Sequence, residues 1–379
     1  MPAFAATRTD YVPVDDVSWS RPAAQTLGFD PARLDEAVAY AREHETAWPI
    51  DVRGHLERGA FEEAPSNAIL GPTKDRGAPN GVILRHGRIA AEWGDTTRID
   101  MTFSVAKSYL SIVAGLAFDR GLFGELDEPA NLRGGPLADD SGANPPHHAT
   151  ITWRHLLQQT SEWEGTLWGK PDMVDRNRQI MGRKGAAPKG SFRALAEPGG
   201  FWEYNDVRIN RLALSLLHLF RKPVAAVFRD LVMDPIGSGP DWRWHGYQNS
   251  TVTIDARSME SVSGGGHWGG GIFINARDQA RVGLMMLRQG LWNDRRILSE
   301  SWIERSLEPC SLNPIYGLLW WLNTGRLLYG DASPTSYFAF GAGYHVTWVD
   351  PEHDLVAVMR WIKDTDVNGF IQRVMRALV

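Results

Sequence analysis

The chain has 379 residues, enough to bury a large core as one big domain or as two lobes. Its 43% hydrophobic and 22% charged residues are typical of a globular soluble protein. The 40 Lys and Arg residues against 45 Asp and Glu give a net charge of −5 and are scattered along the chain, which argues against a nucleic-acid partner.

The cysteine content and the apolar segments of the sequence indicate in which cellular compartment the protein is expected. Cys310 is the single cysteine, so no intrachain disulfide can form, in agreement with a reducing compartment. Residues 1–8 are followed by Asp10 and further aspartates and lack the apolar core of a signal peptide. The most apolar run, residues 109–118, is too short to span a bilayer. We therefore expect a cytoplasmic protein with no membrane partner.

The first third of the chain predicts a wrapping segment, a hairpin and a buried helix. Residues 1–80 are rich in Pro, Asp, Arg and Gly and should wrap the main domain, with one helix over 31–42. Residues 81–94 alternate around a short polar turn, which predicts a β-hairpin. A helix that is apolar nearly all round opens at Ser104 and ends before Gly121, so it should be buried.

The middle of the chain predicts two helices separated by loops. Residues 133–150 are expected to be loop and residues 151–159 helix. Residues 164–200 are polar and rich in Gly and Lys, and should be irregular. Asp206 is the expected N-cap of a helix whose apolar residues recur at helical spacing.

The last third alternates in the manner of strands. A Trp-rich connection at 242–244 and a glycine cluster at 264–271 lead to a short apolar strand and a helix over 276–289. The remaining expected elements are strands over 316–322, 345–349 and 355–361 and a final helix over 367–378. The last two strands must be antiparallel because a short turn joins them.

Ser104 and Lys107 carry the strongest chemical signal. Because Lys107 lies three residues after Ser104 on one helix face, its Nζ can reach the serine Oγ. A neutral lysine can take the hydroxyl proton, and burial together with the positive helix terminus favours that form. The spacing also arises by chance, with a surface lysine after a helix cap as the alternative. A lysine on a helix destined for the core needs a reason, which favours the catalytic interpretation.

Four sequence blocks resemble the β-lactamase-related serine hydrolases, which include class C β-lactamases, family VIII carboxylesterases, D-aminopeptidases and 6-aminohexanoate-dimer hydrolases. The first block is Phe-Ser-Val-Ala-Lys at residues 103–107, which is similar to the family's Ser-x-x-Lys motif. The others, in order, are residues 151–161, 270–281 and 349–356. The resemblance covers about residues 80–379. It implies an α+β protein with the β-lactamase-like fold, an antiparallel sheet flanked by helices plus a mainly helical lobe.

The resemblance also implies lobe boundaries. The sheet lobe would comprise residues 1–130 and 250–379, and the mainly helical lobe would comprise residues 131–249. The active site would lie between the two lobes.

The family's second motif, Tyr-x-Asn, falls by resemblance on Tyr204-Asn205-Asp206. The phenol of Tyr204 would then share proton transfer with Lys107, and the alternative is a core tyrosine beside a helix cap. Asp206 replaces the expected asparagine at a substrate-binding position, which weakens the case for binding a β-lactam.

The third motif falls by resemblance on residues 339–341, Ala-Phe-Gly, where the expected cation or Trp is missing. Gly341 and Gly343 would let a substrate approach the strand, and the N–H groups of Ser104 and Ala342 would form the oxyanion hole. An ordinary bulge at Gly341 is the alternative. Without a lysine here no charge awaits a β-lactam carboxylate, which favours an esterase or a small-amide hydrolase.

Other candidate residues carry weaker signals. His147, His148 and His267 do not form a metal-ligand spacing, so we expect no metal site and no cofactor. The glycine cluster lacks the ending of a phosphate-binding loop. Trp163 and Trp168 are possible substrate contacts, against a core role for both.

The sequence therefore predicts a serine hydrolase that cleaves a small-molecule ester or amide through an acyl-enzyme on Ser104, assisted by Lys107 and Tyr204. The alternatives are a true β-lactamase or D-amino-acid peptidase, and a non-catalytic binding module that retains the fold. The oligomeric state is left open.

Overall fold

The computed structural model describes residues 11–15, 18–182 and 187–379. Its central element is a six-stranded antiparallel sheet in the order β11-β12-β13-β14-β1-β2. The strands are β1 (Asn80–Arg85), β2 (Arg88–Trp93), β11 (Trp321–Leu322), β12 (Tyr337–Gly341), β13 (His345–Asp350) and β14 (Leu355–Arg360). Pairing of β1 with β14 joins the N-terminal and C-terminal parts of the chain in one sheet.

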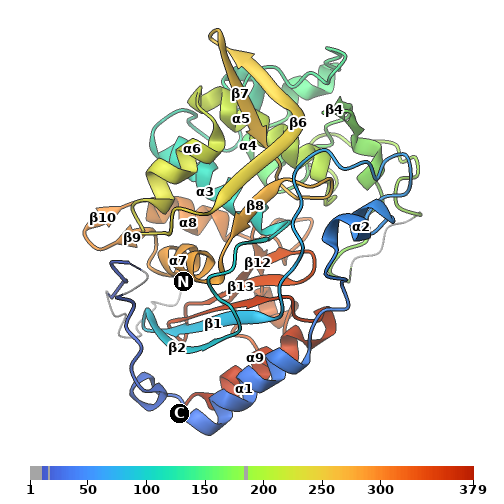
Figure 1. Ribbon diagram of the computed structural model, residues 1–379. Coiled ribbons are helices and arrows are strands. Elements are labelled where there is room, and N and C mark those ends of the chain that lie inside the picture. The colour runs from blue at the N-terminus through green and yellow to red at the C-terminus, as the bar shows by residue number, and fades with distance from the viewer. Residues whose placement is uncertain (1–10, 16–17, 183–186) are drawn as a thin grey trace.

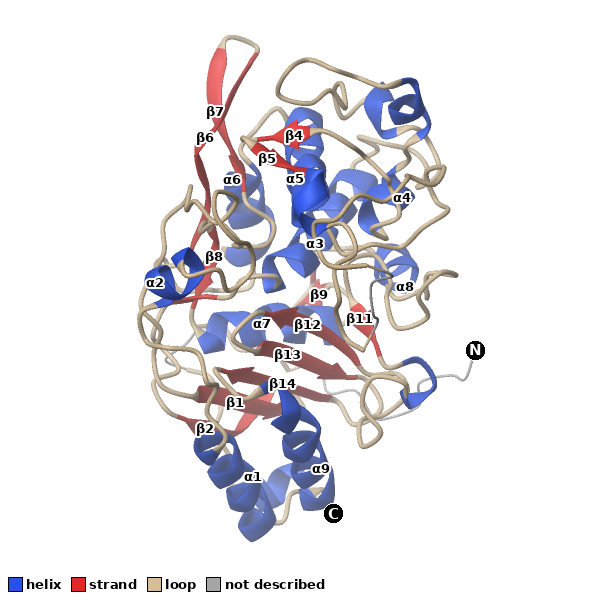
Figure 2. Ribbon diagram, turned by 90° about the vertical axis from the view of Figure 1, so that its right-hand side faces the viewer, coloured by secondary structure: helices blue, strands red, loops and turns tan. Residues whose placement is uncertain are grey.

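Helices cover both faces of this sheet. Helices α1 (Pro31–Glu43) and α9 (Val367–Ala377) pack side by side on one face, as Figures 1 and 2 show. On the other face, α7 (Ala276–Leu287) packs against β1, β13 and β14. Because both faces are covered, every residue of β13 and β14 is buried.

A second antiparallel sheet lies above the first in Figure 2. Its order is β3-β8-β6-β7, and its strands are β3 (Asp100–Met101), β6 (Arg243–Ile254), β7 (Arg257–Val262) and β8 (Gly271–Ile274). Two short hairpins are β4 (Thr166–Leu167) with β5 (Lys170–Pro171), and β9 (Leu291–Trp292) with β10 (Arg295–Arg296).

The buried helix α3 (Val105–Asp119) connects the two regions. Residues 105–117 of this helix are all buried, as its nearly uniform apolar sequence predicts. It packs against β12, α5 (Asp206–Phe220) and α8 (Glu300–Ser306). The N-terminus of α3 therefore lies where the main sheet meets the helices of the upper region, which places Ser104 there.

The remaining helical elements are short. They are α2 (Val52–Glu57), α4 (Trp153–Leu157), α6 (Val224–Phe228), a π-helical turn at Arg229–Met233, and 3-10 turns at Ala24–Leu27, Ala130–Leu132, Pro146–Thr150, Asp172–Asp175, Thr324–Arg326 and Asp364–Asp366. None of the described helices has the length and apolar character needed to cross a bilayer.

Most predicted elements are present with bounds close to the expected ones. The hairpin at 81–94, the helix at Ser104 and the helices predicted over 31–42, 276–289 and 367–378 all form. Gly121 follows α3 with φ +65°, as the residue after a helix C-cap often does.

Four expectations about elements were wrong. The N-cap of α5 is Asn205 and not Asp206, because the Asn205 side chain accepts hydrogen bonds from two N–H groups of the first turn. The Trp-rich connection is the start of the long strand β6. The strand predicted over 316–322 shrinks to β11, and the helix predicted over 151–159 shrinks to α4.

Candidate active site

The N-terminus of α3 holds the predicted nucleophile and its base. Ser104 is the N-cap residue, and the Nζ of Lys107 donates a hydrogen bond of 2.7 Å to its Oγ. Lys107 is only 1% exposed, whereas Ser104 is half-buried and lines a cavity. Phe103 precedes them with φ +50°, in the left-handed region that a non-glycine residue rarely adopts. The turn therefore presents the hydroxyl to the cavity while the lysine stays beneath it.

Tyr204 joins Ser104 and Lys107 at this point. It lies just before α5, is 2% exposed and lines the same cavity. The Nζ of Lys107 lies 4.7 Å from the centroid of its ring, and the guanidinium of Arg178 lies 4.9 Å from the same centroid. Both groups thus lie within 5 Å of the ring centroid, where a positive charge on either one is stabilised by cation–π attraction.

Asp206 is directed toward the lysine and not toward the cavity, of which it is not a lining residue. Its Oδ1 lies 2.9 Å from the Nζ of Lys107 and accepts a hydrogen bond of 3.0 Å from Arg178. Burial by itself would raise the pKa of this carboxyl, but the charges of His267, Lys107 and Arg178 outweigh it and hold the pKa well below its usual range. The structure therefore places Asp206 as an ionised partner of Lys107.

Behind Asp206 lies a set of further buried ionisable groups. His267, Glu62 and Asp175 come close enough to share a metal ion. The Nζ of Lys189 already bridges the two carboxylates, at 2.6 Å from Glu62 and 3.2 Å from Asp175. An ammonium group in that place does not fit a metal centre, so these residues form an ion-pair network.

The end of β12 forms the opposite wall. A Cβ on Gly341 would lie 1.8 Å from the carbonyl oxygen of Thr102 and 3.4 Å from the amide nitrogen of Ser104. The turn Ala342-Gly343-Tyr344 follows, with φ +71° at Gly343. Gly341, Ala342 and Gly343 all line the cavity beside Ser104. The two predicted oxyanion donors thus lie on two segments that touch each other.

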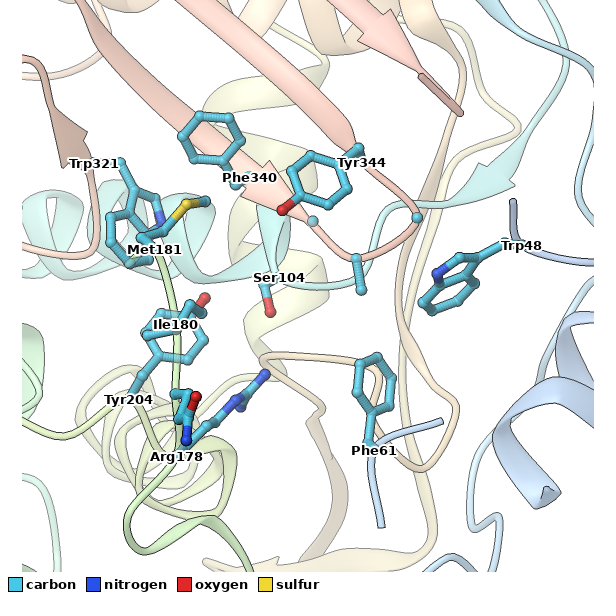
Figure 3. A pocket seen from close by; sticks show the side chains of 14 residues that line it. Trp48, Phe61, Ser104, Arg178, Ile180, Met181, Tyr204, Trp321, Phe340 and Tyr344 are labelled. Carbon is cyan, nitrogen blue, oxygen red and sulfur yellow. The ribbon is translucent and has the colours of Figure 1, made fainter. Parts of the chain in front are cut away.

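Aromatic and apolar side chains form most of the remaining wall. The cavity has a volume of about 360 Å³. Figure 3 shows Ser104 between Tyr204, Trp321 and Phe340 on one side and Trp48 and Phe61 on the other. The other lining residues are Arg178, Gln179, Ile180, Met181 and Tyr344.

Several of these lining residues were not predicted, and two predicted ones are elsewhere. Trp48 and Phe61 come from the N-terminal segment that we expected only to wrap the surface. Trp163 is fully buried and donates its Nε1 hydrogen to the Leu137 carbonyl at 2.7 Å, and Trp168 is 8% exposed; neither lines the cavity. No sequence motif predicts a role for Trp48 or Phe61, because they come close to Ser104 only when the N-terminal segment packs against the rest of the protein.

The sequence and the fold are both similar to those of known proteins. A family model described as Beta-lactamase matches residues 80–369. The fold resembles that of EstCE1, a hydrolase with promiscuous acyltransferase activity, at a TM-score of 0.57 and 16% identity over 92% of this chain and 98% of that one. It also resembles a penicillin-binding protein homologue from Caulobacter crescentus (TM-score 0.56, 12% identity, 88% of this chain and 100% of that one).

A third similar structure is a beta-lactamase from Mycobacterium bovis. Its TM-score is 0.54 at 19% identity, over 79% of this chain and 95% of that one. At these identities the solved structures establish a shared fold.

Proposed function

The chain belongs to the beta-lactamase family and has its hydrolase fold, and on that premise we propose that it is a serine hydrolase that cleaves a small ester or amide through an acyl-enzyme on Ser104. The observation that carries this proposal is the hydrogen bond of 2.7 Å between a buried lysine and the serine Oγ at the edge of a cavity. A non-catalytic binding module has no need for a buried lysine at that place.

The proposed reaction has two steps. The Oγ of Ser104 attacks the substrate carbonyl while its proton passes to neutral Lys107, and the Ser104 and Ala342 N–H groups stabilise the oxyanion. The C–O or C–N bond then breaks, and the leaving alcohol or amine takes a proton from Lys107 or Tyr204. Water activated by the same two side chains attacks the acyl-enzyme and releases the carboxylic acid with free Ser104.

The cavity favours an uncharged, apolar substrate over a β-lactam. Among the described lining residues the one cation is Arg178, and both Asp206 and Asp175 already pair with it, at 3.0 Å and 3.5 Å. A substrate carboxylate would therefore have to compete with two buried carboxylates for this guanidinium. The surrounding Trp, Phe, Ile and Met side chains instead provide apolar contact area for an acyl or alcohol group.

A fluorophosphonate probe tests whether Ser104 is a nucleophile. We expect the wild-type protein to be labelled and Ser104→Ala not to be. Ser108→Ala is the matched control, because Ser108 lies on the same helix, is buried and donates only to the Leu319 carbonyl at 2.8 Å; it should keep the label. An unlabelled wild-type protein would support the binding module instead.

Substrate preference is tested by comparing kcat/KM for a p-nitrophenyl ester, a linear anilide and a cephalosporin. We expect the ester or anilide to be the better substrate. A cephalosporin value equal to or above that of the ester would establish a β-lactamase, and a preference for D-amino-acid amides would establish a D-amino-acid peptidase.

A further inference from the structure

Two lysines, one arginine and three carboxylates behind Ser104 form a balanced set of buried charges, here called the buried charge cluster. Its cations are Lys107, Arg178 and Lys189, and its anions are Asp206, Asp175 and Glu62. Lys107, Asp206 and Asp175 are at most 1% exposed, and Lys189, the most exposed member, is 27% exposed. With all six groups ionised the cluster has no net charge.

Catalysis disturbs this balance. Lys107 must be neutral in order to accept the proton of Ser104, and the cluster would then hold one carboxylate without a matching cation. An uncompensated charge in a buried site is strongly unfavourable. An asparagine at position 206, as in the Tyr-x-Asn motif, would not create this problem, because the cluster would be balanced with neutral Lys107. The aspartate of this chain therefore requires a compensating cation.

His267 is placed to supply that cation. Its Nε2 lies 3.7 Å from the Oδ2 of Asp206, and its Nδ1 lies 3.2 Å from the Oε1 of Glu62 and 3.9 Å from the Oδ2 of Asp175. Its side chain is 2% exposed, and the ring stacks on Phe61 at 4.1 Å between centroids. The charged groups within 4 Å of His267 are thus three carboxylates, each of which also pairs with Lys107, Arg178 or Lys189.

The two ring nitrogens indicate which protonation state fits. A neutral imidazole has one N–H and one acceptor nitrogen. The lone pair of the acceptor nitrogen would then face the lone pair of a carboxylate oxygen, which is repulsive. Among the described residues, neither nitrogen of His267 has a hydrogen-bond partner, and the same holds for the facing Oε1 of Glu62 and Oδ2 of Asp206. An imidazolium would instead be attracted by its charge to the carboxylates near both nitrogens.

The glycine cluster makes this approach possible. A Cβ on Gly265 would lie 1.6 Å from the Oδ2 of Asp206 and 2.7 Å from the Nζ of Lys107. Gly269, Gly270 and Gly271 follow with φ between +67° and +79°. Glycine at 265 therefore lets the loop before β8 pass against the lysine and deliver His267 to Asp206.

We propose that His267 is a positioning residue that carries, as an imidazolium, the positive charge that Lys107 gives up when it becomes the base for Ser104. The inference rests on the proposed function. In the active form the proton count of the cluster is unchanged: Lys107 is the free amine, His267 holds the proton, and Asp206 lies between them as a carboxylate. The pair of Asp206 and His267 thus does in this chain what a neutral asparagine would do alone.

The pH profile of Ser104 reactivity tests the proposal. We would measure the second-order rate constant of fluorophosphonate labelling against pH. In His267→Gln the neutral lysine has no compensating charge, so the acidic limb should move to higher pH by about 1–3 units, with recovery of the rate at high pH. His245→Gln is the control, because His245 is a half-buried histidine that packs on Phe273 in the second sheet. The His245→Gln variant should leave the acidic limb of the pH profile unchanged.

Asp206→Asn should shift the acidic limb of the pH profile in the opposite direction. Removing the carboxylate makes neutral Lys107 the balanced state, so the limb should move to lower pH than in the wild type. In the double variant Asp206→Asn/His267→Gln, the loss of His267 should then have no further effect on the limb. Circular dichroism of each variant verifies the fold.

Three results would overturn the proposal. The first is a uniform loss of rate in His267→Gln with an unmoved limb, which indicates a structural role only. The second is an upward or absent shift in Asp206→Asn. The third does not depend on reactivity. The imidazole ¹⁵N signals of His267 should report an imidazolium in the wild type, and in Asp206→Asn the ring should lose its proton at a lower pH. A neutral ring in both proteins would reject the proposal. An unlabelled wild type with imidazolium signals would instead reject the proposed function.

Discussion

At the scale of single residues, position 341 leaves no space for a side chain. The end of β12 passes so close to the segment before α3 that an added Cβ would overlap the Thr102 carbonyl at 1.8 Å. That close passage puts the turn after β12, with Ala342, beside the amide of Ser104. A residue with any side chain here must push the strand and its turn away from the serine.

Gly341→Ala should therefore lower the rate of Ser104 acylation by about 10²-fold, the typical loss when one oxyanion donor is displaced. The rate of fluorophosphonate labelling and kcat/KM for the ester both measure it. Gly330→Ala is the control, since a Cβ there meets no atom within 4 Å. Unchanged reactivity in Gly341→Ala would show that Ala342 takes no part in the oxyanion hole.

At the scale of elements, the two helices that meet at the site begin differently. The hydroxyl of Ser104, the N-cap of α3, accepts a hydrogen bond from Lys107 and is not used as a cap. The side chain of Asn205, the N-cap of α5, accepts from Val207 N at 3.1 Å and from Arg208 N at 3.2 Å. The cap on α5 holds the first turn of the helix directly after Tyr204, whereas the hydroxyl of Ser104 makes no cap bond and remains available for the proposed reaction.

Asn205→Ala should lower the free energy of unfolding by about 2–4 kcal/mol. The change removes the cap and also leaves the Asp172 carbonyl without its hydrogen bond of 2.9 Å from the buried amide of Asn205. Ser299→Ala removes the cap of α8, whose hydroxyl accepts from Trp302 N at 3.1 Å and also pairs with the exposed Ser301 hydroxyl at 3.1 Å, and should cost about 1 kcal/mol. Urea denaturation compares the two, and equal losses would contradict the role assigned to Asn205.

At the scale of the whole molecule, folding shifts the pKa values of titratable groups in opposite directions. His148 is fully buried, and its Nε2 accepts a hydrogen bond of 3.3 Å from the Glu164 N–H, which requires the neutral ring. Burial, with the neighbouring His147, lowers the pKa of His148 to about 4. His353 is the opposite case, because a hydrogen bond of 3.0 Å with Asp350 raises its pKa.

These two histidines should give the stability opposite pH dependences. The stabilising contribution of neutral His148 is present above pH 6.5 and is lost as the pH falls toward about 4, because the unfolded chain binds the proton first. The stabilising contribution of His353 is present below pH 6.5. It is lost as the pH rises through the raised pKa that His353 has in the folded protein. Chemical denaturation of His148→Gln and His353→Gln across this range measures both, and equal slopes for the two variants would contradict the assignment.

The local part of the site and most of the fold could be predicted from the sequence. Ser104 and Lys107 share one turn of helix, so their spacing in the chain is enough to bring the amine to the hydroxyl. Period-two and helical patterns likewise predicted the β1–β2 hairpin and helices α3, α7 and α9, because the spacing of apolar residues follows from which side chains an element buries. The β6–β7 hairpin was missed because its strand begins inside a cluster of tryptophans that carries no clear alternation.

Only the tertiary structure decided what surrounds these two residues. Glu62, Asp175 and Asp206 lie far apart in the chain and meet at His267. The N-terminal segment brings Trp48 and Phe61 to the cavity. No spacing rule predicts such contacts, since they depend on how whole elements pack and where loops return. Chain connectivity fixes which atoms one helical turn can bring together, whereas the charge balance of a buried site depends on every segment that packs around it.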